Sequence, residues 1–136
     1  MTKATFTPFL TFPSTAEAAI TFYQKVFPGA KITNLVYFDE TIPNTSSEMI
    51  GKVLNGCLEL QGRNIFFMDM DPTSPPAFSW ATSIYIDFPT EEDFDSSFTK
   101  LADKGTVMMG PEPVLQFKKV AWVTDKFGVT WQLVCS

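Results

Sequence analysis

Hydrophobic and polar positions alternate along several short stretches of this chain, a pattern typical of strands with one buried face. Two other stretches place apolar side chains three or four positions apart, which predicts helices over 15–27 and 91–104. The sequence therefore predicts an α+β fold. The expected strands are 5–12, 31–38, 52–60, 65–68, 82–88, 107–109, 114–124 and 129–134.

Both predicted helices begin with a similar capping pattern. Ser14 is expected at the N-cap of the first helix, with Glu17 three positions later, which makes a capping box. Thr90 and Asp93 stand in the same relation at the start of the second helix. Each helix is expected to end at a glycine-containing stop.

These features recur at a constant separation of 76 positions, as from Phe12 to Phe88. The repeat predicts a duplicated β-α-β-β-β module, with module one at about 1–70 and module two at about 80–136. A proline-rich linker at 71–79 joins the modules, and we expect one domain over 1–136. The other matched pairs are Ser14 with Thr90, Glu17 with Asp93, Phe22 with Phe98, and Gly29 with Gly105.

The closing stretch predicts a hairpin in which two β-branched and aromatic runs flank the connection 125–128. Alternation places Val129, Trp131 and Leu133 on an apolar face suited to a core. Gln132 then lies on the opposite face, in the middle of the strand. That second face is the first candidate for a functional surface.

Composition narrows the functional classes. The chain has 136 residues, of which 45% are hydrophobic and 14 are Phe, so a packed core is expected rather than disorder. A net charge of −5 without a basic stripe disfavours duplex nucleic acid as a partner. No long apolar stretch or basic-then-apolar leader is present, so we expect no membrane span and no signal peptide. Cys57 and Cys135 are interpreted as reduced thiols of a cytoplasmic protein.

The chain contains no histidine. The commonest transition-metal ligand and the usual general base are therefore missing. A metal would need carboxylates, thiolates or amides, and a general base would have to be Asp, Glu, Lys or Tyr. Asp39, Glu40, Asp69 and Asp71 could hold a cation through oxygen, but we interpret them as solvated loop acids.

Four stretches resemble one known family. They are the helix 15–32, which carries Phe22-Tyr23 and ends in the run 26–29, the strand segments 51–54 and 66–69, and the closing run 125–132. They are similar to the PhnB-like, or 3-demethylubiquinone 3-methyltransferase-like, family of the vicinal oxygen chelate (glyoxalase/bleomycin resistance/dioxygenase) superfamily. The resemblance covers nearly the whole chain and implies two βαβββ modules that form a half-open mixed-sheet barrel.

The resemblance also implies a divalent metal held by four inward side chains, at positions that correspond here to Thr7, Met68, Ser83 and Gln132. None of these side chains is an anion or an imidazole, so we expect no metal. No glycine-rich loop follows a strand to hold an S-adenosylmethionine-like group. We therefore expect no cofactor.

The same positions are expected to line a cleft between the modules that takes a small organic ligand. The alternative is that Phe and Met side chains fill this space. We interpret Trp80, Trp122 and Trp131 as core or interface residues rather than stacking platforms. The predicted lining is Thr7, Phe9, Thr11, Phe66, Met68, Ser83, Tyr85 and Gln132.

Three functions remain open at this point. The first is a metal-free, PhnB-like small-molecule binding protein. The second is an isomerase, lyase or methyltransferase of unknown substrate, in which Tyr85 could act as a general acid if Lys118 or Lys119 lowered its pKa. The third is a dimeric interaction module without a ligand. The resemblance implies a homodimer, and no catalytic residue is assigned.

Overall fold

The protein's structure, a computed structural model, describes residues 3–73 and 76–136. The chain divides into two compact units, Met1–Pro76 and Ala77–Ser136, and the division lies in the predicted linker. Unit 1 contains β1 (Phe9–Pro13), α1 (Ala16–Val26), β2 (Lys31–Tyr37), the short 3₁₀ helix η1 (Ser47–Met49), β3 (Val53–Leu60) and β4 (Arg63–Met70). Unit 2 contains β5 (Ile84–Phe88), α2 (Glu91–Ala102), β6 (Thr106–Val114), β7 (Phe117–Thr124) and β8 (Thr130–Cys135).

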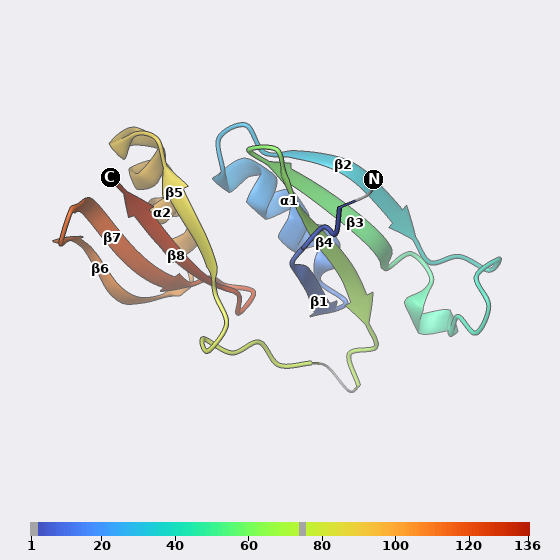
Figure 1. Ribbon diagram of the computed structural model, residues 1–136. Coiled ribbons are helices and arrows are strands. Elements are labelled where there is room, and N and C mark those ends of the chain that lie inside the picture. Colours follow the sequence, from blue (N-terminus) through green and yellow to red (C-terminus); the bar gives the residue numbers. More distant parts are fainter. Residues whose placement is uncertain (1–2, 74–75) are drawn as a thin grey trace. The chain divides into compact units, whose positions relative to one another are not determined.

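Each unit is built on one four-stranded mixed sheet, and the two sheets have the same topology (Figure 1). The strand order is β1-β4-β3-β2 in unit 1 and β5-β8-β7-β6 in unit 2. In each sheet the first strand pairs parallel with the last, and the remaining pairs are antiparallel. The predicted α+β fold and the duplicated β-α-β-β-β order are therefore confirmed.

The core of unit 1 lies between α1 and one face of its sheet, and α1 lies behind this sheet in the view of Figure 1. Tyr23 projects from α1 onto Phe67, with ring centroids 5.9 Å apart, and Phe12 stacks on Phe67 from β1. Gly56 lets the helix approach closely, because a Cβ there would lie 3.2 Å from Cδ1 of Ile20. The four side chains in these contacts are fully buried: Phe12, Ile20, Tyr23 and Phe67.

The core of unit 2 repeats this arrangement with α2. Phe94 of α2 packs edge-on against Phe88 of β5, with ring centroids 6.0 Å apart. Trp131 and Leu133 of β8 are fully buried, as is Leu101 near the end of α2. This confirms that Trp131 belongs to the core and that the odd-numbered positions of β8 face inward.

The capping box predicted at Ser14 is wrong. The N-cap position of α1 is Thr15, and its side chain makes no capping hydrogen bond. Ser14 has a positive φ of 66°, and its buried Oγ has no hydrogen-bond partner among residues 3–73 and 76–136. The carboxylate of Asp69, from β4, instead accepts the backbone N–H of Ala16 at 2.8 Å. A residue distant in sequence thus supplies the cap that local spacing assigns to Ser14.

The cap predicted for the second helix is confirmed. The hydroxyl oxygen of Thr90 accepts the backbone N–H of Asp93 at 3.1 Å. The first turn of α2 also carries Glu91, Glu92 and Asp93, whose negative charges suit the N-terminal end of a helix dipole.

The largest departures from the predicted strand boundaries are at β1 and β6, and β7 also begins at Phe117 rather than at position 114. β1 begins at Phe9 rather than at position 5, because Pro8 has no N–H to donate to the neighbouring strand. β6 extends over Thr106–Val114, where a strand of three residues was expected. β6 is an edge strand, so it accommodates Pro111 and Pro113 together with irregular register against β7.

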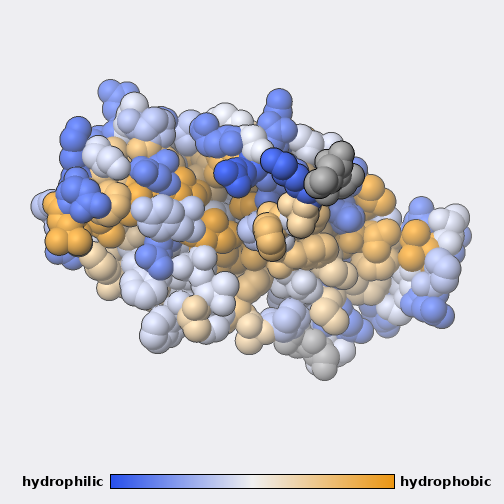
Figure 2. Space-filling view, viewed as in Figure 1, coloured by the Kyte–Doolittle hydropathy of each residue, from blue (hydrophilic) through white to orange (hydrophobic). Residues whose placement is uncertain are grey.

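Several hydrophobic side chains remain on the surface, and the space-filling view shows hydrophobic atoms among hydrophilic ones (Figure 2). Large hydrophobic side chains are exposed in both units, among them Phe9, Val36, Met70, Trp80 and Leu115. Within residues 3–73 and 76–136, no helix has the length and apolar character needed to cross a membrane.

Candidate functional site

The face of the second sheet opposite α2 carries the predicted functional glutamine. On β8, Trp131 and Leu133 point to the helix, so Gln132 between them points to the other side. Its Cα partners are Tyr85 on β5 and Trp122 on β7. Partners in adjacent strands place their side chains on the same face, so these three residues form a row across the sheet.

Gln132 and Ser83 are joined directly. The side-chain amide of Gln132 donates a hydrogen bond to Oγ of Ser83 over 2.9 Å, in a partly buried setting. The Ser83 hydroxyl keeps a proton to donate and the Gln132 carbonyl oxygen remains an acceptor. Two of the four positions that the resemblance groups together are therefore side by side in unit 2.

Aromatic side chains flank this polar pair. Tyr85 is 56% exposed and is the direct cross-strand partner of Gln132 on β5. Trp80 lies edge-on to Trp122, with ring centroids 6.0 Å apart and planes at 76°. Trp80 is 64% exposed, so it is not a core residue. We call Trp80, Ser83, Tyr85, Trp122 and Gln132 the Gln132 face.

The corresponding face of the first sheet carries four more predicted residues. Phe9 pairs in register with Phe66, and their rings meet edge-on at 5.9 Å. Thr11 pairs with Met68 in the same way. Thr7 lies before β1, although the backbone pairing extends past Phe9 through a 2.9 Å hydrogen bond from Phe66 N–H to the Pro8 carbonyl. The cleft predicted between the two modules stays a prediction.

Three of the four acidic residues considered as a cation site accept hydrogen bonds within the fold, and the fourth, Glu40, is exposed. Asp69 is buried, which contradicts its interpretation as a solvated loop acid, and it accepts backbone N–H groups from Ala16 and Val53 at 2.8 Å each. Asp39 and Asp71 are exposed and accept hydrogen bonds from Thr41 and Thr73, respectively, which lower the pKa of each carboxyl. Within the described part of the chain, no three His, Cys, Asp or Glu side chains are grouped to hold a metal ion.

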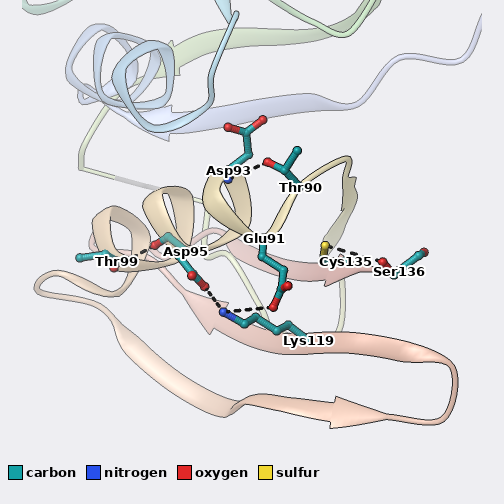
Figure 3. Close-up of polar contacts among 8 residues, drawn as sticks. All are labelled: Thr90, Glu91, Asp93, Asp95, Thr99, Lys119, Cys135 and Ser136. Atoms are coloured by element: carbon teal, nitrogen blue, oxygen red, sulfur yellow. Dashed lines mark hydrogen bonds and ion pairs between the residues drawn. The ribbon is translucent and has the colours of Figure 1, made fainter.

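Lys119 cannot act on Tyr85, because it lies on the helix side of the second sheet (Figure 3). Its Nζ is 2.6 Å from Asp95 and 3.8 Å from Glu91, both on α2. The hydrogen bond that Lys119 donates to Asp95 is the main cause that raises the pKa of Lys119. Lys118, the other lysine considered as a partner of Tyr85, is an exposed strand residue.

A surface hollow of about 520 Å³ lies on the C-terminal half of α2, lined by Phe98, Thr99, Lys100, Ala102 and Asp103. None of the predicted site residues lines it. It is wide open to solvent and lies on the outer side of the helix, so it adds nothing to the Gln132 face.

Comparisons with known proteins decide the family. The family model described as 3-demethylubiquinone-9 3-methyltransferase matches residues 4–134. The chain belongs to this family. Protein YjdN of Escherichia coli K12 is 25% identical to it over 137 aligned positions, covering 93% of this chain and 91% of YjdN. The PhnB protein of Bacillus cereus is 32% identical, with a TM-score of 0.84 over 98% of this chain and 100% of that chain.

The fold extends to a wider superfamily. A glyoxylase/bleomycin resistance protein/dioxygenase domain from Frankia sp. has a TM-score of 0.66 with this chain. The two are 12% identical, and the match covers 100% of this chain and 93% of that domain. At this identity the likeness shows the shared fold alone.

The residues present do not fit the metal that the superfamily implies. Thr7, Met68, Ser83 and Gln132 include no anionic side chain and no imidazole, and Ser83 and Gln132 bond to each other. Hard cations select carboxylate oxygens, and borderline cations select imidazole or thiolate. A divalent ion would therefore gain little from this set.

A methyl donor of the S-adenosylmethionine type does not fit the described loops either. The turns that follow β1 and β5 contain Pro, Ser and Thr but no glycine. The N-terminus of α1, where an anionic group of a cofactor would bind, already receives the Asp69 carboxylate.

Sequence reasoning missed Trp122 as a neighbour of Gln132. The expected connection over 125–128 would pair Thr124 with Val129 and Trp122 with Trp131, whereas the observed register pairs Thr124 with Thr130 and Trp122 with Gln132. The contact between Trp80 and Trp122 had no signal either, because Trp80 lies outside any strand.

Proposed function

We propose that this member of the family is a small-molecule binding protein that works without a metal ion, and that the Gln132 face is the main contact surface. The hydrogen-bonded pair of Gln132 and Ser83, set among aromatic rings in the middle of a sheet face, supports this proposal most strongly.

The composition of the Gln132 face favours binding over simple packing. Ligand sites combine apolar and aromatic walls with a few polar groups that orient the ligand. Tyr85 and Trp80 are more than half exposed, so their rings are available for contact. Gln132 retains an acceptor and Ser83 a donor after their mutual hydrogen bond is formed.

The polar groups would contribute orientation more than bulk affinity. A hydrogen bond to a neutral group contributes about 0.5–1.5 kcal/mol net, and leaving a buried partner unsatisfied costs about 1–3 kcal/mol. Removing the Gln132 amide should therefore weaken binding by about 1–3 kcal/mol if its bond to the ligand is buried.

Native mass spectrometry of freshly purified protein tests this proposal, because it detects a bound ligand of any structure by its mass. We expect a small organic mass bound to the wild type, much reduced in Gln132→Ala and retained in Gln116→Ala. Gln116 is a suitable control because it lies exposed at the β6–β7 turn. The melting temperatures of both variants should stay close to that of the wild type.

Two results would argue against the proposal. One is a bound mass unaffected by Gln132→Ala, which would move the site elsewhere. The other is a large loss of stability in Gln132→Ala, which would make Gln132 a structural amide. Elemental analysis of the same sample measures its metal content, and one equivalent of a divalent ion per chain would contradict metal-free binding.

The same family resemblance motivates a homodimer as a further proposal. Exposed hydrophobic side chains such as Val36, Ile50 and Leu115 are consistent with surface covered by a second copy. Light scattering at several concentrations tests it, and a constant monomer mass would reject it.

A further inference from the structure

Two indole N–H groups are buried in unit 2, and they differ in whether the protein supplies a hydrogen-bond acceptor. Nε1 of Trp131 donates to Oδ2 of Asp125 over 2.8 Å, so the protein itself satisfies it. Nε1 of Trp122 is also buried, but no acceptor in the described part of the chain reaches it. A buried donor without a partner is uncommon and costs free energy, so its presence calls for a physical reason.

The position of Trp122 suggests that reason. It is the direct cross-strand partner of Gln132 on the face that we propose as the binding surface. Trp80 meets it edge-on, and Tyr85 lies one strand beyond Gln132. The lone indole N–H therefore belongs to the same small area as the free acceptor of Gln132 and the free donor of Ser83.

We propose that the Gln132 face binds a flat, uncharged ring that carries a carbonyl-type acceptor, and that this acceptor takes its hydrogen bond from Nε1 of Trp122. This inference rests on the proposed binding function and names the ligand class. The ring packs against the aromatic side chains, since aromatic surfaces prefer stacked or edge-on contact with other rings.

The absence of charge follows from the side chains in the row of residues that contains Trp122. Ser83, Tyr85, Trp122 and Gln132 are neutral, so none of them could neutralise a charged group that loses its water. The charged residues on this side of the sheet, Asp87, Glu112 and Lys118, are exposed. Asp87 pairs with Val134, two residues along β8 from Gln132.

Three probes that share one ring system test the ligand class. 2-Naphthamide carries an uncharged carbonyl, naphthalene carries no acceptor, and 2-naphthoate carries a charge. Indole N–H signals in ¹H–¹⁵N spectra report on the chain's three Trp residues separately. Trp80→Phe and Trp122→Phe assign two signals, and the remaining one belongs to Trp131.

We expect 2-naphthamide to move the Trp122 signal downfield in a saturable way, as a new hydrogen bond requires. The Trp131 signal is the internal control and should stay in place, because Asp125 already holds that N–H. Naphthalene should bind without the downfield shift, and 2-naphthoate should bind more weakly than 2-naphthamide.

Affinity provides a second readout. Trp122→Phe should weaken 2-naphthamide binding about tenfold, the loss of one buried hydrogen bond of about 1.4 kcal/mol, while naphthalene binding changes little. Its melting temperature should not fall sharply, because the protein loses no hydrogen bond of its own. A sharp fall, with equal losses for both ligands, would show a purely packing role for Trp122 and overturn the inference.

The outcomes separate this inference from the proposed function. If 2-naphthamide does not bind, or binds without moving the Trp122 signal, the ligand class is wrong. The binding function is then judged independently by the Gln132-dependent mass in native mass spectrometry. Tighter binding of 2-naphthoate than of 2-naphthamide would also overturn the uncharged class while leaving a binding function in place.

Discussion

The carboxylate of Asp69 accepts the backbone N–H of Ala16, 2.8 Å away and 53 positions earlier in the chain. Its second oxygen accepts the N–H of Val53, also at 2.8 Å. One buried side chain at the end of β4 thus joins the start of α1 to the start of β3. The first turn of the helix is satisfied by tertiary structure rather than by a neighbouring residue.

Replacing Asp69 by Asn should therefore destabilise the protein. The amide has the same shape, but its NH₂ group would face one of the two donors, leaving a buried N–H unsatisfied at a cost of about 1–3 kcal/mol. Urea unfolding measures this loss. Asp71→Asn is the matched control, because Asp71 is exposed and accepts from nearby Thr73. Equal small losses would show that the Asp69 contacts contribute nothing.

The two halves of the repeat predict different outcomes for equivalent cap substitutions. Thr90→Ala should cost about 0.5–2 kcal/mol, because the Thr90 hydroxyl caps α2. Ser14→Ala should cost little or nothing, because the buried Ser14 oxygen has no partner to lose in the described part of the chain. Chemical unfolding of both variants decides this, and a larger loss at Ser14 would restore the sequence-based capping box.

A methyl group added at Gly105 should be poorly tolerated. A Cβ there would lie 2.5 Å from the Thr124 carbonyl oxygen and 2.8 Å from that of Leu101, so backbone must move. We expect Gly105→Ala to lose about 1–3 kcal/mol through overpacking. Gly62→Ala, where the space is open but φ is +75°, isolates the backbone strain of a turn glycine. A melting temperature unchanged in Gly105→Ala would contradict the packing seen between α2 and β7.

Restoring metal-ligand chemistry should create affinity that the natural residues lack. Ser83 and Gln132 touch each other, so Ser83→His combined with Gln132→Glu places an imidazole and a carboxylate together. Calorimetric titration with zinc should show tighter binding for the double variant than for either single variant. No gain from the pair would mean that these positions do not converge as ligands.

Much of the fold could be predicted from the sequence because its signals are local. The spacing of Phe94, Phe98 and Leu101 predicts a helix independently of its tertiary contacts. Alternation along β8 places Gln132 on the face opposite Trp131, whichever strands lie beside it. The repeated cap and stop signals located both helices to within two residues of their ends.

The predictions of a helix cap and of a strand length were wrong where contacts with residues distant in sequence decided the local structure. Asp69 took over the cap predicted for Ser14, and an irregular edge pairing with β7 let β6 extend through two prolines. Local periodicity carries no information about which strand lies next to an edge, or about which carboxylate reaches a helix end.

The sequence by itself determined the duplicated module, the two helices, the two faces of the closing strand and the lack of imidazole. These follow from residue type and spacing along one chain. Only the tertiary structure decided that Gln132 meets Ser83, that Asp69 is buried as a cap, and that the indole N–H of Trp122 lacks an acceptor within the described residues. The physical reason is that hydrogen-bond satisfaction depends on groups brought together by packing, and their separation in space is not encoded in their separation along the chain.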